Sequence, residues 1–318
     1  MIVRCVREAC LRWARLALIA FAMRSGLRGD VRGPLDGDMW WREWEFDPAT
    51  VVLLFVGVAL YAAGLRCLRL ATGKPAKLRR PAVCFAAGWL VLVLALLSPL
   101  HPWSSVWFFV HMTQHELLMV VAAPLLVLGR PALVMLWAFP RRVAGAALAA
   151  SRRAGLGHLW RCSTNVFVAS LVHAIVLWAW HVPQFFEATL ASDAVHALQH
   201  GTFLGTALMF WQAVLFGERR AADYGLAVLY LFLTAMHSGA LGALITFASS
   251  PWYGTYAAAL EERPFTPLED QQLGGLIMWI PAGMVYVVAG LVLFAAWLRD
   301  SERRAQTSRR ETRCAPAV

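Results

Sequence analysis

The sequence predicts an all-α protein, a polytopic membrane helix bundle of about seven transmembrane helices. The chain is 59% hydrophobic and 15% charged, whereas a soluble domain carries about 25% charged residues. Its apolar residues gather in long runs, and a membrane-spanning helix needs about 20 of them. Its basic residues are sorted to alternate connections between these runs. Together these observations favour a multi-pass membrane protein over a soluble one.

Seven apolar runs define the predicted helices. They occupy residues 50–70, 82–99, 105–128, 164–181, 197–216, 225–247 and 273–298. Arginines and lysines cluster after the first, third and fifth runs and in the C-terminal tail, whereas the opposite connections hold only Arg263. Because positively charged loops stay in the cytoplasm, we expect the amino end of the first helix outside and the C-terminus in the cytoplasm.

Three regions follow from this pattern. Residues 1–47 form an N-terminal extension, in which 1–23 fits a cleaved signal, an extra helix or a misassigned start, and 40–47 is an aromatic segment suited to the outer interface. Residues 48–298 form the seven-helix transmembrane domain. Residues 299–318 form a basic cytoplasmic tail, which we expect to be disordered.

The net charge of +10 is accounted for by these loops and the tail, and no basic motif with interleaved aromatics indicates a nucleic-acid partner. The long connection 129–163 has an apolar part that we expect to lie along the inner interface or to re-enter it. The six cysteines form no CxxC pair, so they are poor candidates for metal ligands.

Histidines provide the main functional signal. His111 and His115 lie four residues apart within a predicted span, so they share one helix face. A histidine in the hydrocarbon region is costly without a partner, and a pair there indicates a functional site. His196 and His200 repeat the spacing at the outer start of the fifth run.

The remaining histidines also favour the outer side. His181 lies at the outer end of the fourth run, His173 lies deeper in that run, and His237 lies near the middle of the sixth. His101 belongs to an outer loop, and His158 alone to an inner loop. A single membrane histidine such as His173 is more often a hydrogen-bond partner between helices than a ligand, whereas a repeated HxxxH pair favours metal or haem contact.

The residue types point to copper. His111, His115 and Met119 recur every four residues, and imidazole with thioether suits copper, above all Cu(I). The candidate metal ligands are His111, His115, Met119, His173, His181, His196, His200 and His237, and the candidate accessory residues are Met112, Glu116, Asp270 and Gln271. A methionine in such a segment is more often a core residue than a ligand, and Asp270 and Gln271 could simply cap the seventh helix. We predict no catalytic residue.

Several motifs resemble those of the polytopic cytochrome c oxidase assembly factors of CtaG type. The resemblance runs from about Trp40 to Leu298. It is carried by WREWEFDP, SPLHPW, HMTQHELLMVVAAPLLVLGRP, the stretch from WHVPQFFEATL to HALQHGTFL, and DQQLGGLIMWIPAG. It implies a bacterial plasma (inner) membrane protein that helps to assemble haem–copper oxidase at its copper centres, with oxidase subunits, the lipid bilayer and a periplasmic copper donor as partners.

Three other functions use the same residues and stay open at this stage. The chain could be a copper transport or resistance protein, or a membrane electron carrier with haem between facing histidines. It could also be a metal-dependent membrane oxidase, since such enzymes use HxxxH boxes, although the additional HxxHH box is absent and those boxes face the cytoplasm.

Overall fold

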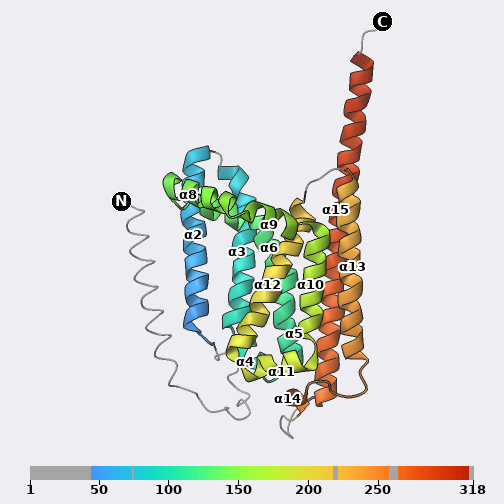
Figure 1. Ribbon diagram of the computed structural model, residues 1–318. Helices are drawn as coiled ribbons and strands as arrows, with labels where there is room; N and C mark the ends of the chain where they lie inside the picture. The colour runs from blue at the N-terminus through green and yellow to red at the C-terminus, as the bar shows by residue number, and fades with distance from the viewer. Residues whose placement is uncertain (1–43, 74, 218–220, 258–263, 315–318) are drawn as a thin grey trace.

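The computed structural model describes residues 44–73, 75–217, 221–257 and 264–314, and within these ranges every regular element is a helix (Figure 1). The main helices are α2 (Pro48–Thr72), α3 (Pro75–Leu97), α10 (Val166–Trp180), α12 (Asp193–Phe216), α13 (Ala221–Thr246) and α15 (Pro267–Cys314). One further membrane-length segment consists of α5 (Phe108–Glu116), the π-helix η2 (Leu117–Ala122) and α6 (Ala123–Gly129).

Short helices cover both ends of the bundle. Figure 1 shows α4 (Leu100–Ser104), α11 (Pro183–Ala191) and α14 (Gly254–Ala257) at one end. At the other end lie α8 (Arg141–Arg153), α9 (Leu156–Ser163) and the last part of α15, with α7 (Pro131–Leu136) packed against α2. The basic segments therefore share the end opposite to α4 and α11.

Each of the seven predicted runs coincides with a helical segment, which confirms the all-α membrane bundle. By length and composition, five helices in the described ranges qualify as spans, or six if α9 and α10, which meet at a 74° bend, form one. α12 is not among them, because His196, Gln199 and His200 lower its hydropathy. The count of seven and the orientation stay predictions. Residues 1–23, Trp40 and Trp41 lie outside the described ranges.

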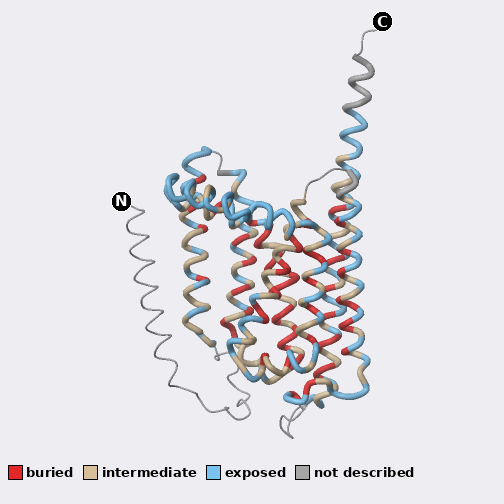
Figure 2. The backbone as a smooth tube through the Cα atoms, viewed as in Figure 1, coloured by how far each residue is buried: buried red, intermediate tan, exposed pale blue. Residues whose placement is uncertain are grey.

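The centre of the bundle is the segment α5–η2–α6 together with α12. Buried residues concentrate in these helices (Figure 2). By contrast, α2, α13 and α15 expose many large apolar side chains. The central segment packs against α3, α12 and α15. Exposed apolar side chains such as Phe232, Leu291 and Val292 form the kind of surface that suits lipid rather than water.

A π-helical turn interrupts the central segment. Pro124 has no N–H, so it cannot donate to a carbonyl one turn earlier. The amide of Ala123 donates to Leu118 O instead of Met119 O, and the freed Met119 carbonyl accepts a hydrogen bond from Trp211 Nε1 at 3.0 Å. The wide turn thus lies directly before Pro124, and the Met119 carbonyl that it frees is satisfied by Trp211.

The C-terminal tail differs from the expectation of disorder. α15 continues to Cys314, well beyond the bundle (Figure 1). Residues 299–314 contain neither Gly nor Pro and are rich in good helix formers, and Arg304 pairs with Asp300 one turn earlier. The connection 129–163 is also helical. α8 and α9 bury no residue and carry arginines beside exposed apolar side chains, as expected for helices along a membrane interface.

Candidate metal-binding histidine cluster

The two HxxxH pairs lie side by side on α5 and α12. His111 faces His196 with 5.1 Å between ring centroids, and His115 faces His200 with 5.4 Å. Along the helices, the rings are 4.3 Å apart in the first pair and 4.2 Å apart in the second. We call these four residues the histidine ladder. Its outer rung, nearer the α4 and α11 end of the bundle, is His111 and His196, and its inner rung, farther from that end, is His115 and His200.

Two more histidines adjoin the ladder. His101, on α4, has its ring 5.4 Å from that of His196 and 6.2 Å from that of His200. His181 follows the last residue of α10 and interacts electrostatically with His111 and His115. Sequence reasoning included His181 but left His101 in an outer loop. The signal that could have found His101 is its place directly before the helix of the first pair.

Most of these imidazoles have buried nitrogens without hydrogen-bond partners. These atoms are both nitrogens of His115 and Nε2 of His181, His196 and His200. A buried polar atom without a partner destabilises the fold, and native proteins seldom keep one. Each neutral imidazole offers one nitrogen lone pair, so several such rings in one place indicate a site for an electrophilic ligand such as a metal ion.

The His181 imidazole is oriented for coordination. Its Nδ1 donates to Leu177 O at 2.7 Å, which places the proton on Nδ1 and leaves the lone pair on Nε2. A backbone acceptor on the second ring nitrogen is the usual outer-shell partner of a metal-binding histidine. The Tyr253 hydroxyl donates to His181 O at 3.1 Å, and burial raises the pKa of Tyr253, so this hydroxyl stays a donor.

Hydrogen bonds from amide side chains distinguish His101 and His111. Gln114 Nε2 donates to Ala95 O at 2.6 Å and to His101 Nδ1 at 3.1 Å. His111 Nε2 lies 3.2 Å from Gln199 Oε1. Coordination by either histidine through these nitrogens requires it to release its glutamine.

The second ring nitrogen of His111 also has polar neighbours. Its Nδ1 lies 3.3 Å from both Ser104 O and the Tyr256 hydroxyl, and that hydroxyl donates to Ser104 O at 2.5 Å. His111 is therefore the ladder member with partners on both nitrogens. These contacts link α4, α5 and α14 around the outer rung.

The cluster fits a metal ion in residue type and spacing. An imidazole nitrogen lies about 2.0–2.1 Å from zinc, so two imidazoles on one such ion have ring centroids roughly 4.4–6.3 Å apart, depending on the ligand angle. The ladder separations fall in or near that range. Among the described residues, no group of three His, Cys, Asp or Glu side chains already surrounds one ion position. Binding therefore requires the rings to turn about their side-chain bonds.

The remaining candidates on the central segment have other surroundings. Met112 and Met119 lie in a hydrophobic core cluster with Phe108 and Phe203. The step from His115 to Met119 crosses the π-helix, so the predicted four-residue stripe is not regular there. Glu116 keeps a buried carboxylate oxygen without a hydrogen-bond partner.

His173 and His237 lie apart from the ladder. His173 Nδ1 is 3.1 Å from the Thr206 hydroxyl, and its ring stacks on Phe210. Phe210 is ten residues beyond His200, about 15 Å along α12. His237, on α13, interacts electrostatically with His173 and has no hydrogen-bond partner on either nitrogen. The structure thus separates a deeper pair from the outer cluster.

Asp270 and Gln271 act between helices rather than at the start of α15 alone. Asp270 accepts hydrogen bonds from the amides of Phe108 and Phe109, at 2.9 and 3.0 Å. It therefore caps α5, the helix of the first histidine pair. Gln271 Oε1 accepts from Trp252 N at 2.6 Å. Both side chains fix the α4 and α11 end of the bundle around the ladder.

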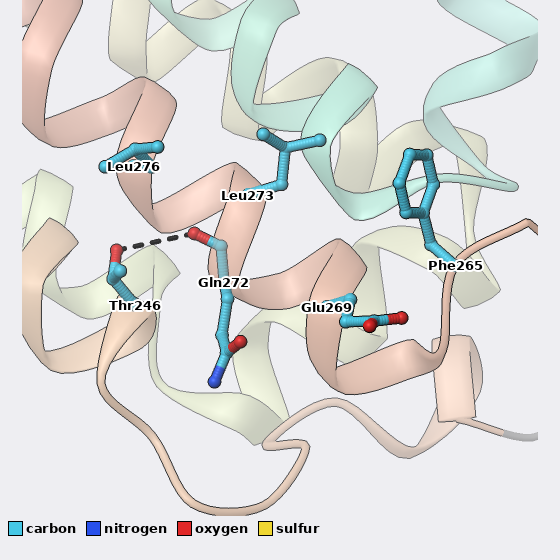
Figure 3. A pocket seen from close by; sticks show the side chains of 6 residues that line it. All are labelled: Thr246, Phe265, Glu269, Gln272, Leu273 and Leu276. Atoms are coloured by element: carbon cyan, nitrogen blue, oxygen red, sulfur yellow. Dashed lines mark hydrogen bonds between the residues drawn. The ribbon is translucent and has the colours of Figure 1, made fainter.

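A shallow pocket of about 340 Å³ lies elsewhere, between the end of α13 and the start of α15 (Figure 3). It is lined by Thr246, Phe265, Glu269, Gln272, Leu273 and Leu276. No histidine lines it, so it is not part of the candidate metal site.

Comparison with known proteins places the chain in a family. The chain is 26% identical over 271 residues to uncharacterized proteins of Mycobacterium bovis and Mycobacterium tuberculosis, with 82% of this chain and 40% of each relative covered. An uncharacterized protein of Mycobacterium leprae is 26% identical over 278 residues with the same coverage. The chain thus spans about 40% of the length of these relatives. No solved structure gives a significant match.

The family model named Caa3_CtaG, cytochrome c oxidase caa3 assembly factor, matches residues 59–300. The matched range includes the histidine ladder, His101, His181 and Asp270. It also includes all the main helices except the first part of α2 and the last part of α15. Since the match covers most of the sequence, this chain belongs to the cytochrome c oxidase caa3 assembly factor family.

Proposed function

We propose that this chain is a non-catalytic factor of the bacterial plasma membrane that helps to form a copper centre of haem–copper cytochrome c oxidase. The observation that carries the proposal is the histidine ladder with its unpartnered buried nitrogens at His115, His196 and His200. Neutral imidazoles can bind a copper ion and release it by ligand exchange, which is what a factor that passes on its cargo needs.

The ladder chemistry supports copper as the cargo. Imidazole suits copper, zinc, iron and nickel, and copper is the metal among these that an oxidase copper centre requires. The ladder lies at the bundle end formed by α4 and α11, opposite to the basic helices α8 and α9 (Figure 1). With basic segments in the cytoplasm, the ladder lies in the periplasmic half of the bundle. We infer a periplasmic copper donor and a copper-accepting oxidase subunit as partners.

The haem alternative is harder to reconcile with the ladder. Two axial histidines need a porphyrin plane between them, with iron bound on both faces. The His111 and His196 rings are nearly parallel and only 5.1 Å apart, and Phe186 packs 4.9 Å from the His111 ring. The distance between the two rings suits a single metal ion better than a porphyrin.

The test combines oxidase assembly with metal analysis. In a strain that lacks the chain, we expect the oxidase to lose bound copper and activity, and restoring the wild-type gene should recover both. The double variant His111→Ala/His115→Ala should fail to restore them while reaching the membrane in normal amount. Normal copper content and activity in the deletion strain would refute the proposal. Haem absorbance from the purified chain would instead support the electron-carrier alternative.

A further inference from the structure

The two rungs of the ladder lie at different depths in the bundle. α5 and α12 both start at the α4 and α11 end, so the outer rung is nearer that end. The inner rung is four residues farther along each helix, about 6 Å. An ion that enters from the outer end therefore meets His111 and His196 before it meets His115 and His200.

The hydrogen bonding of the rungs differs in the same direction. At the outer rung, His196 Nε2 has no partner, but both nitrogens of His111 have polar neighbours, and His101, which stacks on His196, accepts from Gln114. At the inner rung, both nitrogens of His115 and Nε2 of His200 have no partner. An ion at the outer rung thus competes with existing hydrogen bonds, whereas an ion at the inner rung satisfies buried atoms that have none.

A third imidazole adjoins the inner rung. The rings of His181 and His115 both lie against Phe203, at 6.2 and 4.7 Å between centroids. His181 lies near both His111 and His115 and keeps a buried Nε2 without a partner. His115 and His200 thus form the inner rung, and His181, at the end of α10, can join them as a third ligand once the rings turn about their side-chain bonds.

Six imidazoles are more than one ion can use, because such ions generally bind four ligands. We propose that the cluster provides two copper positions in series. His101, His111 and His196 form an outer position that takes up the ion, and His115, His181 and His200 form an inner position that holds it more tightly. This inference rests on the proposed copper binding and names the order in which its ligands act. The transfer exchanges neutral imidazoles and moves no electron or proton.

The test titrates the purified full chain with Cu(I) under reducing conditions against a chromogenic Cu(I) chelator. We expect two ions per chain in two affinity classes. His115→Asn/His200→Asn should abolish the tight class. His101→Asn/His196→Asn should abolish the weak class, keep the tight one, and slow its loading about tenfold or more. His158→Asn, on the exposed helix α9, is the matched control and should retain both classes.

The histidine variants could lose copper because they misfold, so a further variant keeps every histidine. Gln199→Leu removes the amide that competes for His111 Nε2. One hydrogen bond corresponds to about tenfold in affinity, so the weak class should tighten by about that factor while the tight class stays unchanged. An unchanged weak class would contradict the assigned outer position.

The outcomes separate this inference from the proposed function. A single ion per chain, lost equally in both double variants, would overturn the two positions while copper binding stands. No copper in the wild-type chain would overturn both. Two ions with the expected variant pattern, together with an unaffected oxidase in the deletion strain, would uphold the two positions and refute the role in oxidase assembly.

Discussion

The Asp270 carboxylate at the start of α15 accepts a hydrogen bond from the Phe108 amide at the start of α5, at 2.9 Å. A second bond joins its other oxygen to Phe109 N at 3.0 Å. Asp270 is 1% exposed. One buried carboxylate therefore fixes the N-terminus of the helix that carries His111, three residues later, and ties it to the last helix of the bundle.

We expect Asp270→Ala to destabilise the protein by about 1–2 kcal/mol, as for loss of a helix cap, and to weaken copper binding because the first turn of α5 loosens. Asp270→Asn, with one acceptor oxygen, should lie between Ala and wild type. Thermal unfolding in detergent and copper titration measure both effects. Glu269→Ala is the control, since this exposed neighbour caps only its own helix through Thr266. Equal effects of the two alanine variants would argue against the cap on α5.

Gly274 allows the close approach of α15 to α5. A Cβ built there would lie 2.3 Å from Phe108 Cδ1. We expect Gly274→Ala to cost about 1–3 kcal/mol, as for other overpacked cores. Gly283→Ala, in the same helix with nothing within 4 Å of the new Cβ, should be neutral or stabilising. Thermal unfolding compares the two, and the same melting temperature for both would contradict the packing.

Trp211 satisfies the carbonyl that the π-helix frees. Trp211→Phe keeps an aromatic ring but removes the donor to Met119 O, which leaves a buried acceptor unpaired at a cost of about 1–3 kcal/mol. Trp180→Phe is the matched control, because its indole donates to the partly buried Thr202 hydroxyl, which has other backbone partners. Chemical unfolding should rank Trp211→Phe as clearly the less stable variant.

The separation of the deeper histidines predicts different metal phenotypes. His173→Asn and His237→Asn should retain the copper content of the wild type, because these residues lie outside the outer cluster. His115→Asn should lose most of it. Metal analysis of the purified variants decides, and loss of copper in His173→Asn would mean that the site extends about 12 Å deeper than His181.

The charge distribution predicts the orientation. Cys162 is exposed on α9 at the basic end. In a variant that keeps Cys162 as its single cysteine, this residue should react with a membrane-impermeant maleimide only after the cells are permeabilised. Ser105→Cys in a cysteine-free chain should react in intact cells, because Ser105 is exposed beside α4 at the ladder end. The reverse labelling pattern would place the ladder in the cytoplasm and favour the membrane oxidase alternative.

The sequence determined the features that depend on local pattern. Apolar runs near 20 residues gave the helical segments of the bundle, and four-residue spacing put each HxxxH pair on one helix face. Two expectations drawn from the local pattern were wrong. The π-helix after His115 makes the stripe to Met119 irregular, and the helix-forming residues after Leu298 extended α15 instead of ending it.

Only the tertiary structure decided which histidines meet. It paired His111 with His196 and His115 with His200 across the neighbouring helices α5 and α12, added His101 and His181, and left His173 with Thr206. It also turned Asp270 from a cap of its own helix into the cap of α5. The physical reason is that helix formation depends on neighbours within a few residues, whereas the packing of one helix on another depends on the fit of side chains that are far apart in the sequence.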